Sequence, residues 1–384
     1  MKIVADSKIP YVLDAFAGLA DVVVVEAQSI SPAIVRDADV LVVRSETKVN
    51  RWLVGDTALK FVATATIGTD HVDTGYLQER GIGFASAPGS NARSVAEYVV
   101  AALLVIAARR GLALAGGSIG VVGVGNVGKI VVRFARALGM EVLQNDPPLA
   151  RATDDPVFLP LDRLMEADII TLHVPLTKTG DDKTFHLFDE SRIRRMRQGS
   201  ILINTSRGGV VETEGIKGRV HGRHLAGCVL DVWEGEPAID TELVGLALLG
   251  TPHIAGYSFD GKVNGTVMVQ KAVCEHFGLH STWAPPDLDA RGGQSPVLVP
   301  EGVQRDAALL AAIRTCYDIE ADDRALRQIS NLPLSERPIH FRRLRREYRM
   351  RREFPNYRVM VPGSQMSLLD VFRTLGFVTM SAGD

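Results

Sequence analysis

The chain has 384 residues, which is longer than a single hydrophobic core usually supports, so two or three domains are expected. Its 46% hydrophobic and 23% charged residues are typical of a globular protein, and a net charge of −2 gives no general attraction to nucleic acid or membrane. Cys228, Cys274 and Cys316 lack metal-ligand spacing and predict neither disulfides nor a metal site. The N-terminus has no secretory signal pattern, which favours a cytoplasmic location.

Short β-branched runs alternate with helix-like segments from the N-terminus, which predicts an open parallel sheet. A helix is predicted at residues 94–108, and its apolar stretch is too short to cross a bilayer, so we expect it to be buried. A second series of strands follows. The predicted strands cover residues 3–5, 22–25, 40–43 and 61–65 in the first series, and 119–122, 142–144, 169–172, 201–203 and 227–230 in the second.

The last third of the chain has a different character. A glycine-rich return is expected after Ile254, followed by a helix at residues 267–277. Residues 283–297, rich in proline and glycine, are expected to be a linker. Beyond residue 304 come a helical pattern, the basic run FRRLRREYRMRRE and a strand–helix–strand pattern ending near Met380. The predicted fold class is α/β, with two doubly wound parallel-sheet domains and a smaller α+β C-terminal domain.

A glycine motif lies between the strand pattern SIGVV and a helical pattern, the context of a Rossmann dinucleotide loop. Its three glycines suit a tight turn, backbone approach to a pyrophosphate and close helix–strand packing, in that order. An acid at the end of the next strand suits a ribose hydroxyl and repels the 2′-phosphate of NADP. An isolated motif could be a plain turn, but all these features occur in order. We therefore predict NAD, bound by Gly123, Gly125, Asn126, Val127, Gly128 and Asp146.

Three charged residues follow predicted strands: Arg207 in INTSRGG, Glu236 in DVWEGEP and His253 in TPHIAGY. Singly, each would usually be structural or solvated. Together with TATIGTDHVD at residues 64–73, these motifs resemble the D-2-hydroxyacid dehydrogenase family from residue 1 to about residue 280. The resemblance implies two Rossmann-like domains, the nucleotide-binding domain being inserted into the substrate domain, with the active site in the cleft between them.

The resemblance also implies roles for individual residues. His253 would be the general acid/base on the substrate 2-hydroxyl, Glu236 would hold and polarise its imidazole, and Arg207 would pair with the substrate carboxylate. The chemistry agrees, because imidazole exchanges protons near neutral pH and a guanidinium can grip a carboxylate with two parallel hydrogen bonds. The further cofactor contacts implied are Thr205, Ser206, Arg207, Asp231 and Gly256.

Within this family, LVVRSETKVN at residues 41–50, NDPP at 145–148, HIAGYSFDGKVNGT at 253–266 and the added C-terminal domain are similar to the erythronate-4-phosphate dehydrogenases. That resemblance implies NAD-dependent oxidation of 4-phospho-D-erythronate to 2-oxo-3-hydroxy-4-phosphobutanoate in pyridoxal phosphate (vitamin B6) biosynthesis. It also implies a homodimer. The implied domains are a substrate (lid) domain at 1–95, a nucleotide domain at 96–256, a return segment at 257–282 and a dimerisation domain at 283–384.

The implied substrate contacts are Ser45, Thr66 and Tyr257. We add Arg44 as a contact for the phosphate or carboxylate, with a structural salt bridge as an equal alternative. In the basic run, Arg351 and Arg352 are candidates for the phosphate, although such a run is more often a solvated helix face.

Two features depart from the family pattern. Related enzymes often carry Thr where this chain has Val174, which removes a hydroxyl contact to the cofactor. The helix expected after Arg207, within residues 212–224, contains Gly215, Gly218 and Gly222, and each interior glycine costs about 1 kcal/mol relative to alanine. The alternatives to the implied function are another 2-hydroxyacid enzyme, such as a phosphoglycerate or glycerate dehydrogenase, and a protein that senses NAD(H) without turnover.

Overall fold

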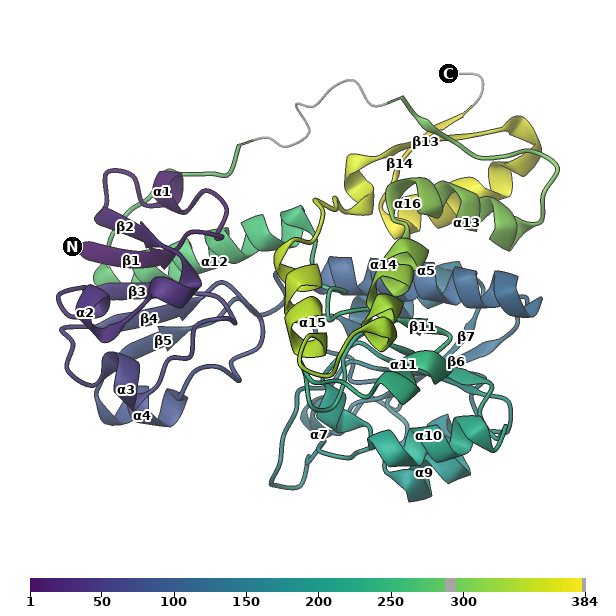
Figure 1. The fold of residues 1–384 in the computed structure, drawn as a ribbon. Coiled ribbons are helices and arrows are strands. Elements are labelled where there is room, and N and C mark those ends of the chain that lie inside the picture. Colours follow the sequence, from purple (N-terminus) through teal and green to yellow (C-terminus); the bar gives the residue numbers. More distant parts are fainter. Residues whose placement is uncertain (287–294, 382–384) are drawn as a thin grey trace. The chain divides into compact units, whose positions relative to one another are not determined.

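The computed structural model describes residues 1–286 and 295–381, which form two compact units (Figure 1). The smaller unit comprises Met1–Asn91 and the described residues from Ser258 to 286, and the larger unit comprises Ala92–Tyr257 and residues 295–381. The chain therefore leaves the smaller unit after Asn91 and returns to it at Ser258. Of the predicted linker, residues 287–294 lie outside the described part.

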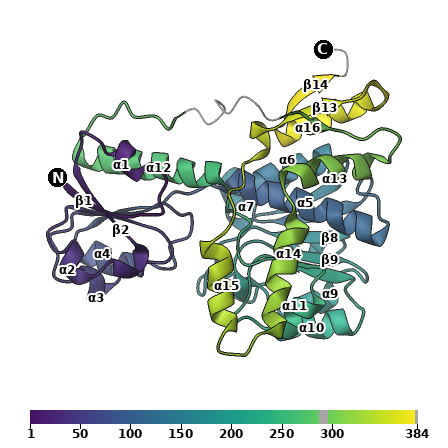
Figure 2. The same ribbon diagram turned by 45° about the horizontal axis from the view of Figure 1, so that its top comes forward.

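The smaller unit is built on a five-stranded parallel sheet of order β2-β1-β3-β4-β5. Helices α1 (Val12–Ala15) and α12 (Phe259–Phe277) cover one face, and α2 (Pro32–Val35), α3 (Arg51–Val54) and α4 (Thr74–Glu79) cover the other (Figure 2). The four predicted strands are confirmed, and β5 was missed because it is only three half-buried residues. The strands are β1 (Lys2–Asp6), β2 (Asp21–Val25), β3 (Val40–Val43), β4 (Phe61–Thr64) and β5 (Gly83–Ala85).

Helix α12 begins eight residues earlier than predicted, at Phe259. The chain does return to the smaller unit here, but Gly261 and Gly265 of the expected glycine-rich return lie in the helix and not in a loop. The Ser258 side chain accepts from the Gly261 N–H and caps the helix. The glycines serve packing instead of a turn. A Cβ on Gly261 would lie 2.8 Å from the Asn91 Cβ, and one on Gly265 would lie 2.9 Å from the Ala65 carbonyl oxygen.

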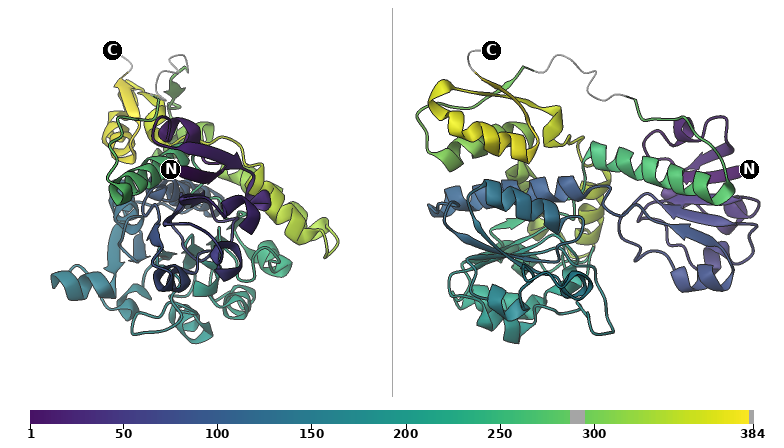
Figure 3. Two further views of the ribbon diagram at one scale, coloured as in Figure 1. Left: turned by 90° about the vertical axis from the view of Figure 1, so that its left-hand side faces the viewer. Right: turned by 180° about the vertical axis from the view of Figure 1, so that it is seen from behind.

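The larger unit contains a six-stranded parallel sheet of order β11-β10-β9-β8-β6-β7, with helices on both faces (Figure 3). Helices α5 (Ala92–Arg110) and α6 (Gly128–Ala137) pack on one face. The opposite face is covered by α8 (Leu161–Leu164), α9 (Glu190–Arg195), α10 (Thr213–His221) and α11 (Thr241–Leu246). The strands are β6 (Ser118–Val122), β7 (Glu141–Asn145), β8 (Ile169–Leu172), β9 (Ile201–Asn204), β10 (Gly227–Leu230) and the unpredicted β11 (Leu249–Gly250).

Helix α5 is buried on all sides, as the sequence predicts: every residue from 94 to 107 is buried. The reason lies in the C-terminal segment, because α13 (Arg305–Cys316) packs against α5 (Figure 2). A helix that is apolar on all faces needs such a second cover. Among the described residues, no helix is both long and apolar enough to span a membrane.

The C-terminal segment adds a small three-stranded parallel sheet and further helices, which confirms the predicted strand–helix–strand pattern. Its α16 packs on α6, and its apolar side chains join the same core as those of α5. The elements are β12 (Val297–Leu298), α14 (Ile319–Arg327), α15 (Arg337–Arg346), β13 (Arg358–Val361), α16 (Leu369–Leu375) and β14 (Val378–Ser381). Residues 295–381 are thus part of the larger unit's core.

Candidate active site

In the glycine loop between β6 and α6, the outer two glycines are closely packed and the middle one faces open space. Gly123 has φ +85°, and an added Cβ would lie 2.7 Å from the His173 carbonyl oxygen. A Cβ on Gly128 would lie 1.9 Å from the Gly123 oxygen. By contrast, a Cβ on Gly125 would meet no described atom within 4 Å beyond its chain neighbours. The protein itself therefore requires the outer two glycines, whereas Gly125 leaves its backbone accessible to a ligand.

The start of helix α6 and the acid after β7 complete a site that fits NAD. No side chain caps α6 at Val127, so its first N–H groups can receive a pyrophosphate. Asp146 accepts from the Val124 N–H at 2.8 Å and from the Leu149 N–H at 3.0 Å, where it caps α7 (Pro147–Thr153). Both oxygens keep lone pairs for a ribose hydroxyl.

Asp146→Asn is expected to weaken NAD(H) binding, because the ribose hydroxyl loses a charged acceptor. It should also reduce the preference for NAD(H) over NADP(H), because the charge that repels a 2′-phosphate is lost. Asparagine keeps one oxygen for the helix cap. Fluorescence titration with NADH and NADPH measures both affinities. Asp189→Ala is the matched control, since Asp189 also caps a helix, α9, but lies outside the glycine loop. An unchanged preference in Asp146→Asn would reduce Asp146 to a structural cap.

The three candidate catalytic residues follow β9, β10 and β11, whose carboxyl ends share one edge of a parallel sheet. The structure brings Glu236 and His253 into direct contact, with His253 Nδ1 2.8 Å from Glu236 Oε2. The other carboxylate oxygen of Glu236 accepts from the Trp233 N–H at 2.8 Å. Glu236 is therefore held at both oxygens.

The ionisation of Glu236 decides which nitrogen of His253 carries a proton. Burial acts to raise the pKa of Glu236, but His253 and the hydrogen bonds outweigh it, and the net pKa is lowered. An ionised carboxylate can only accept, so His253 Nδ1 is the donor. His253 Nε2 is then left to exchange a proton with a substrate.

The loop that carries His253 is fixed by Asp231. Its carboxylate accepts from the Thr251 hydroxyl at 2.6 Å and from the backbone N–H groups of Ile254 and Ala255 at 2.7 and 2.9 Å. His253 itself has φ +58°, a left-handed conformation that costs a non-glycine residue roughly 1–2 kcal/mol. These bonds hold it there. Asp231 is only 1% exposed, and burial raises its pKa; its predicted cofactor contact stays a prediction.

Arg207 is connected to Glu236 through closely packed backbone. The Asn204 side chain donates to the Arg207 carbonyl at 2.9 Å. A Cβ on the next residue, Gly208, would lie 2.0 Å from the Trp233 carbonyl atoms, so only glycine fits between the two segments. Because the Trp233 N–H in turn donates to Glu236, the strand ends form one contiguous structure.

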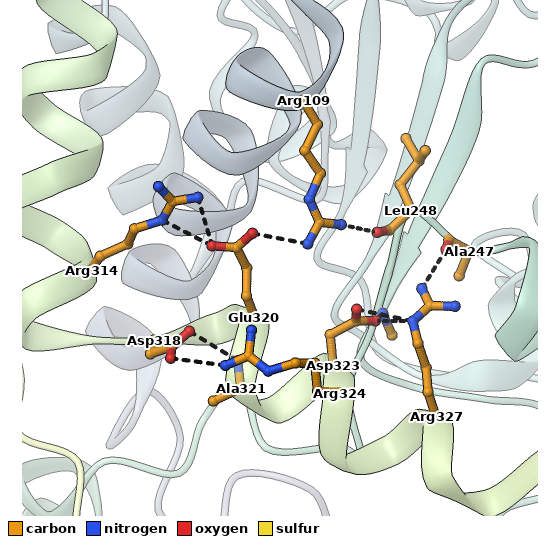
Figure 4. A network of polar contacts seen from close by, with 11 residues as sticks. Arg109, Ala247, Leu248, Arg314, Asp318, Glu320, Ala321, Asp323, Arg324 and Arg327 are labelled. Atoms are coloured by element: carbon orange, nitrogen blue, oxygen red, sulfur yellow. Dashed lines mark hydrogen bonds and ion pairs between the residues drawn. The ribbon is translucent and has the colours of Figure 1, made fainter.

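Helix α14 of the C-terminal segment anchors the strand that leads to His253 (Figure 4). Asp323 accepts from the Gly250 N–H at 2.8 Å, and Arg327, paired with Asp323, donates to the Ala247 carbonyl at 2.7 Å. Glu320 pairs with Arg109 at 2.9 Å, and Arg109 donates to the Leu248 carbonyl at 2.7 Å. The C-terminal segment therefore supports β11 directly.

The remaining predicted residues fall in both units. In the smaller unit, Arg44 pairs with the buried Asp6 at 3.0 Å, Ser45 is exposed, and Thr66 donates to the Gly68 carbonyl at 3.1 Å. The pair with Asp6 is the predicted structural alternative for Arg44, and a substrate role is untested.

In the larger unit, the burial of Arg351 argues against its predicted phosphate role, although its Nε and Nη1 have no hydrogen-bond partner among the described residues. Arg351 is 3% exposed and donates to the Ser94 and Ala255 carbonyls. Arg352 donates to the Asn356 side chain. The Tyr257 hydroxyl is 3.1 Å from Arg345 Nη2, a residue that sequence reasoning missed although it stands in the same basic run. Which arginine of the run lies beside Tyr257 depends on how α15 and the segment after it pack, and periodicity does not show this.

The two departures from the family pattern have local structural correlates. Val174 follows His173, and the His173 ring lies 3.2 Å from the Thr205 hydroxyl. Burial lowers the pKa of His173 to about 3, so the ring beside Val174 is neutral. Helix α10 forms in spite of its glycines. A Cβ on Gly215 would lie 2.9 Å from the Glu190 Cα, so this glycine permits close packing on α9.

A dinucleotide loop, an Arg–Glu–His set and a parallel sheet define the class: an NAD-dependent 2-hydroxyacid dehydrogenase. Residues 99–255 match the family model described as "D-isomer specific 2-hydroxyacid dehydrogenase, NAD binding domain", and residues 296–376 match a domain of unknown function (DUF3410).

Comparison with curated proteins identifies the particular family. The chain is 42% identical to an erythronate-4-phosphate dehydrogenase of Marinobacter nauticus, over 98% of this chain and 99% of that protein. It is 45% identical to an erythronate-4-phosphate dehydrogenase of Salinibacter ruber, over 95% of this chain and 94% of that protein. The chain belongs to the erythronate-4-phosphate dehydrogenase family.

Solved structures agree with this class. An NAD-dependent formate dehydrogenase of Staphylococcus aureus in complex with NAD is 25% identical, with a TM-score of 0.61, over 74% of this chain and 97% of that one. A D-lactate dehydrogenase of Aquifex aeolicus, complexed with NAD and lactic acid, is 26% identical, with a TM-score of 0.60, over 72% of this chain and 96% of that one.

Proposed function

We propose that the chain oxidises 4-phospho-D-erythronate to 2-oxo-3-hydroxy-4-phosphobutanoate with NAD, as a step of pyridoxal phosphate biosynthesis. The observation that carries the proposal is the His253–Glu236 pair, which lies in the same unit as a glycine loop that fits NAD. The names of the full-length relatives supply the substrate.

In this mechanism the chain positions the substrate and moves one proton. The glycine loop and Asp146 would hold NAD, which would supply the acceptor for the hydride of the substrate C2. His253 Nε2 takes the proton of the 2-hydroxyl, and the resulting imidazolium is stabilised by the Glu236 carboxylate at Nδ1. Arg207 pairs with the C1 carboxylate and orients C2. Ser45, Thr66 and Tyr257 are proposed as further substrate contacts.

We also propose a cytoplasmic homodimer. The free cysteines of the described chain are consistent with a reducing compartment. Several large apolar side chains of the C-terminal segment are exposed, and such groups often mark interfaces: Leu298, Leu334, Ile339, Met350 and Val378. Truncation before residue 295 would remove part of the larger unit's core, so light scattering on the whole chain is the suitable measurement.

The function is tested with a panel of phosphorylated and unphosphorylated 2-hydroxy acids, followed by NADH absorbance. We expect the highest kcat/KM for 4-phosphoerythronate. A preference for phosphoglycerate or glycerate would assign the chain a different substrate within the same chemistry. Tight NADH binding without turnover of any acid would instead indicate a nucleotide-sensing protein.

A further inference from the structure

We propose that Arg345, on helix α15, binds the phosphate of the substrate and so makes the enzyme selective for a phosphorylated 2-hydroxy acid. The inference rests on the proposed function and adds a residue that recognises the phosphate. It places part of the specificity on the C-terminal segment, since Arg345 lies within the region 296–376 and outside the matched NAD-binding domain at 99–255.

Arg345 lies beside the loop that carries the acid/base. Its Nη2 donates to the Tyr257 hydroxyl at 3.1 Å, and its guanidinium carbon lies 5.7 Å from the centre of the Tyr257 ring. Tyr257 stands four residues after His253, and its N–H donates to the Ile254 carbonyl at 2.8 Å. Glu236 is also close enough to act electrostatically on Arg345. All of these residues belong to the larger unit.

No carboxylate of the described residues forms a direct ion pair with Arg345, although Glu236 acts on it from a greater distance. Among residues 1–286 and 295–381, no acid lies within ion-pair distance of it, and its buried Nε has no hydrogen-bond partner there. Other arginines nearby are paired: Arg346 with Glu347 at 3.1 Å, and Arg349 with Asp322. A partly buried cation with a buried, unused donor is costly unless an anion binds to it.

The missing anion is best explained as a phosphate. Arg207 is the residue assigned to the substrate carboxylate, so the second anionic group of the substrate needs a separate partner. A phosphate offers several acceptor oxygens to a planar guanidinium. Arg351 also has buried nitrogens, Nε and Nη1, without hydrogen-bond partners among the described residues, but it is only 3% exposed and its Nη2 donates to the Ser94 and Ala255 carbonyls, so a substrate phosphate has less access to it than to the partly exposed Arg345. Arg352, the second predicted candidate, donates to the Asn356 side chain.

The test compares Arg345→Gln and Arg345→Lys with Arg346→Gln, a control on the same helix that loses only an exposed pair. The measurements are kcat/KM for 4-phosphoerythronate and for erythronate, NADH affinity, and calorimetric binding of inorganic phosphate to the NADH-bound chain. Arg345→Gln should lower kcat/KM for the phosphorylated acid by about 10- to 100-fold, as expected for losing a charged hydrogen bond. In Arg345→Gln, erythronate turnover and NADH affinity should stay near those of the unsubstituted chain, whereas phosphate binding should weaken. Arg345→Lys should retain part of the phosphate binding.

Equal losses on both acids would overturn the proposal, because Arg345 would then only support Tyr257 or the acid/base. Unchanged phosphate binding in Arg345→Gln would overturn it as well. If the unchanged chain shows no preference for 4-phosphoerythronate, the proposed substrate is wrong. Phosphate binding still decides the role of Arg345 in that case, since a loss in Arg345→Gln supports an anion site and no loss rejects it.

Discussion

Replacing His253 is expected to remove most of the turnover and to leave NADH affinity nearly intact. A positioned acid/base typically contributes about 10²–10⁴-fold and acts on the chemical step, whereas the glycine loop that receives NAD is unchanged. Asparagine is the better replacement than alanine, because His253 has φ +58° and asparagine tolerates that conformation. A low kcat in His253→Asn therefore reports lost chemistry and not backbone strain.

His221→Ala is the matched control for this experiment. His221 also pairs with a glutamate, Glu242, at 3.0 Å, but on the surface of α10. It should keep full activity, as an exposed pair contributes little. Stopped-flow measurement of NADH formation gives the chemical step, and fluorescence gives the cofactor affinity. Full turnover in His253→Asn would contradict the proposed mechanism.

Replacing Glu236 with glutamine is expected to have a comparably large effect, although the shape of the side chain is preserved. Glu236 accepts two hydrogen bonds, one from the Trp233 N–H and one from His253 Nδ1. Glutamine has one oxygen and one NH₂ group, so it can satisfy only one of the two donors. If the oxygen stays with Trp233, the NH₂ group faces Nδ1 and drives the imidazole proton onto Nε2.

An imidazole with its proton on Nε2 cannot accept the proton of the substrate hydroxyl. The equivalent carboxylate-to-amide change in a Ser-His-Asp triad lowers kcat by about 10⁴-fold, and we expect at least about 10²-fold here. Glu234→Gln is the control, because Glu234 also pairs with a histidine, His186, at 2.7 Å. Steady-state kinetics across a range of pH measures the effect. A kcat in Glu236→Gln equal to that of the control would reject the role given to Glu236.

Much of the fold and of the candidate site could be predicted from local sequence. The β-branched strands were recognisable because a parallel strand buried on both faces is a continuous apolar run, as in β3 and β8. The glycine loop was recognisable because its constraints are local: Gly128 has no room for a side chain next to Gly123. The Arg–Glu–His set was found through the resemblance of motifs at strand ends to those of the D-2-hydroxyacid dehydrogenase family.

The sequence by itself determined the α/β class, the positions of most strands and the glycine loop, because short-range patterns encode each of them. The acid/base candidates came from the resemblance of sequence motifs to a known family. Tertiary structure alone decided what depends on contacts between distant segments. Packing of α13 buries α5, and packing of the C-terminal segment buries Arg351 while it brings Arg345 to Tyr257. Arginines in one basic run have the same chemistry, and only their positions in the fold, Arg345 on α15 and Arg351 in the segment after it, separate a candidate ligand-binding cation from a core one.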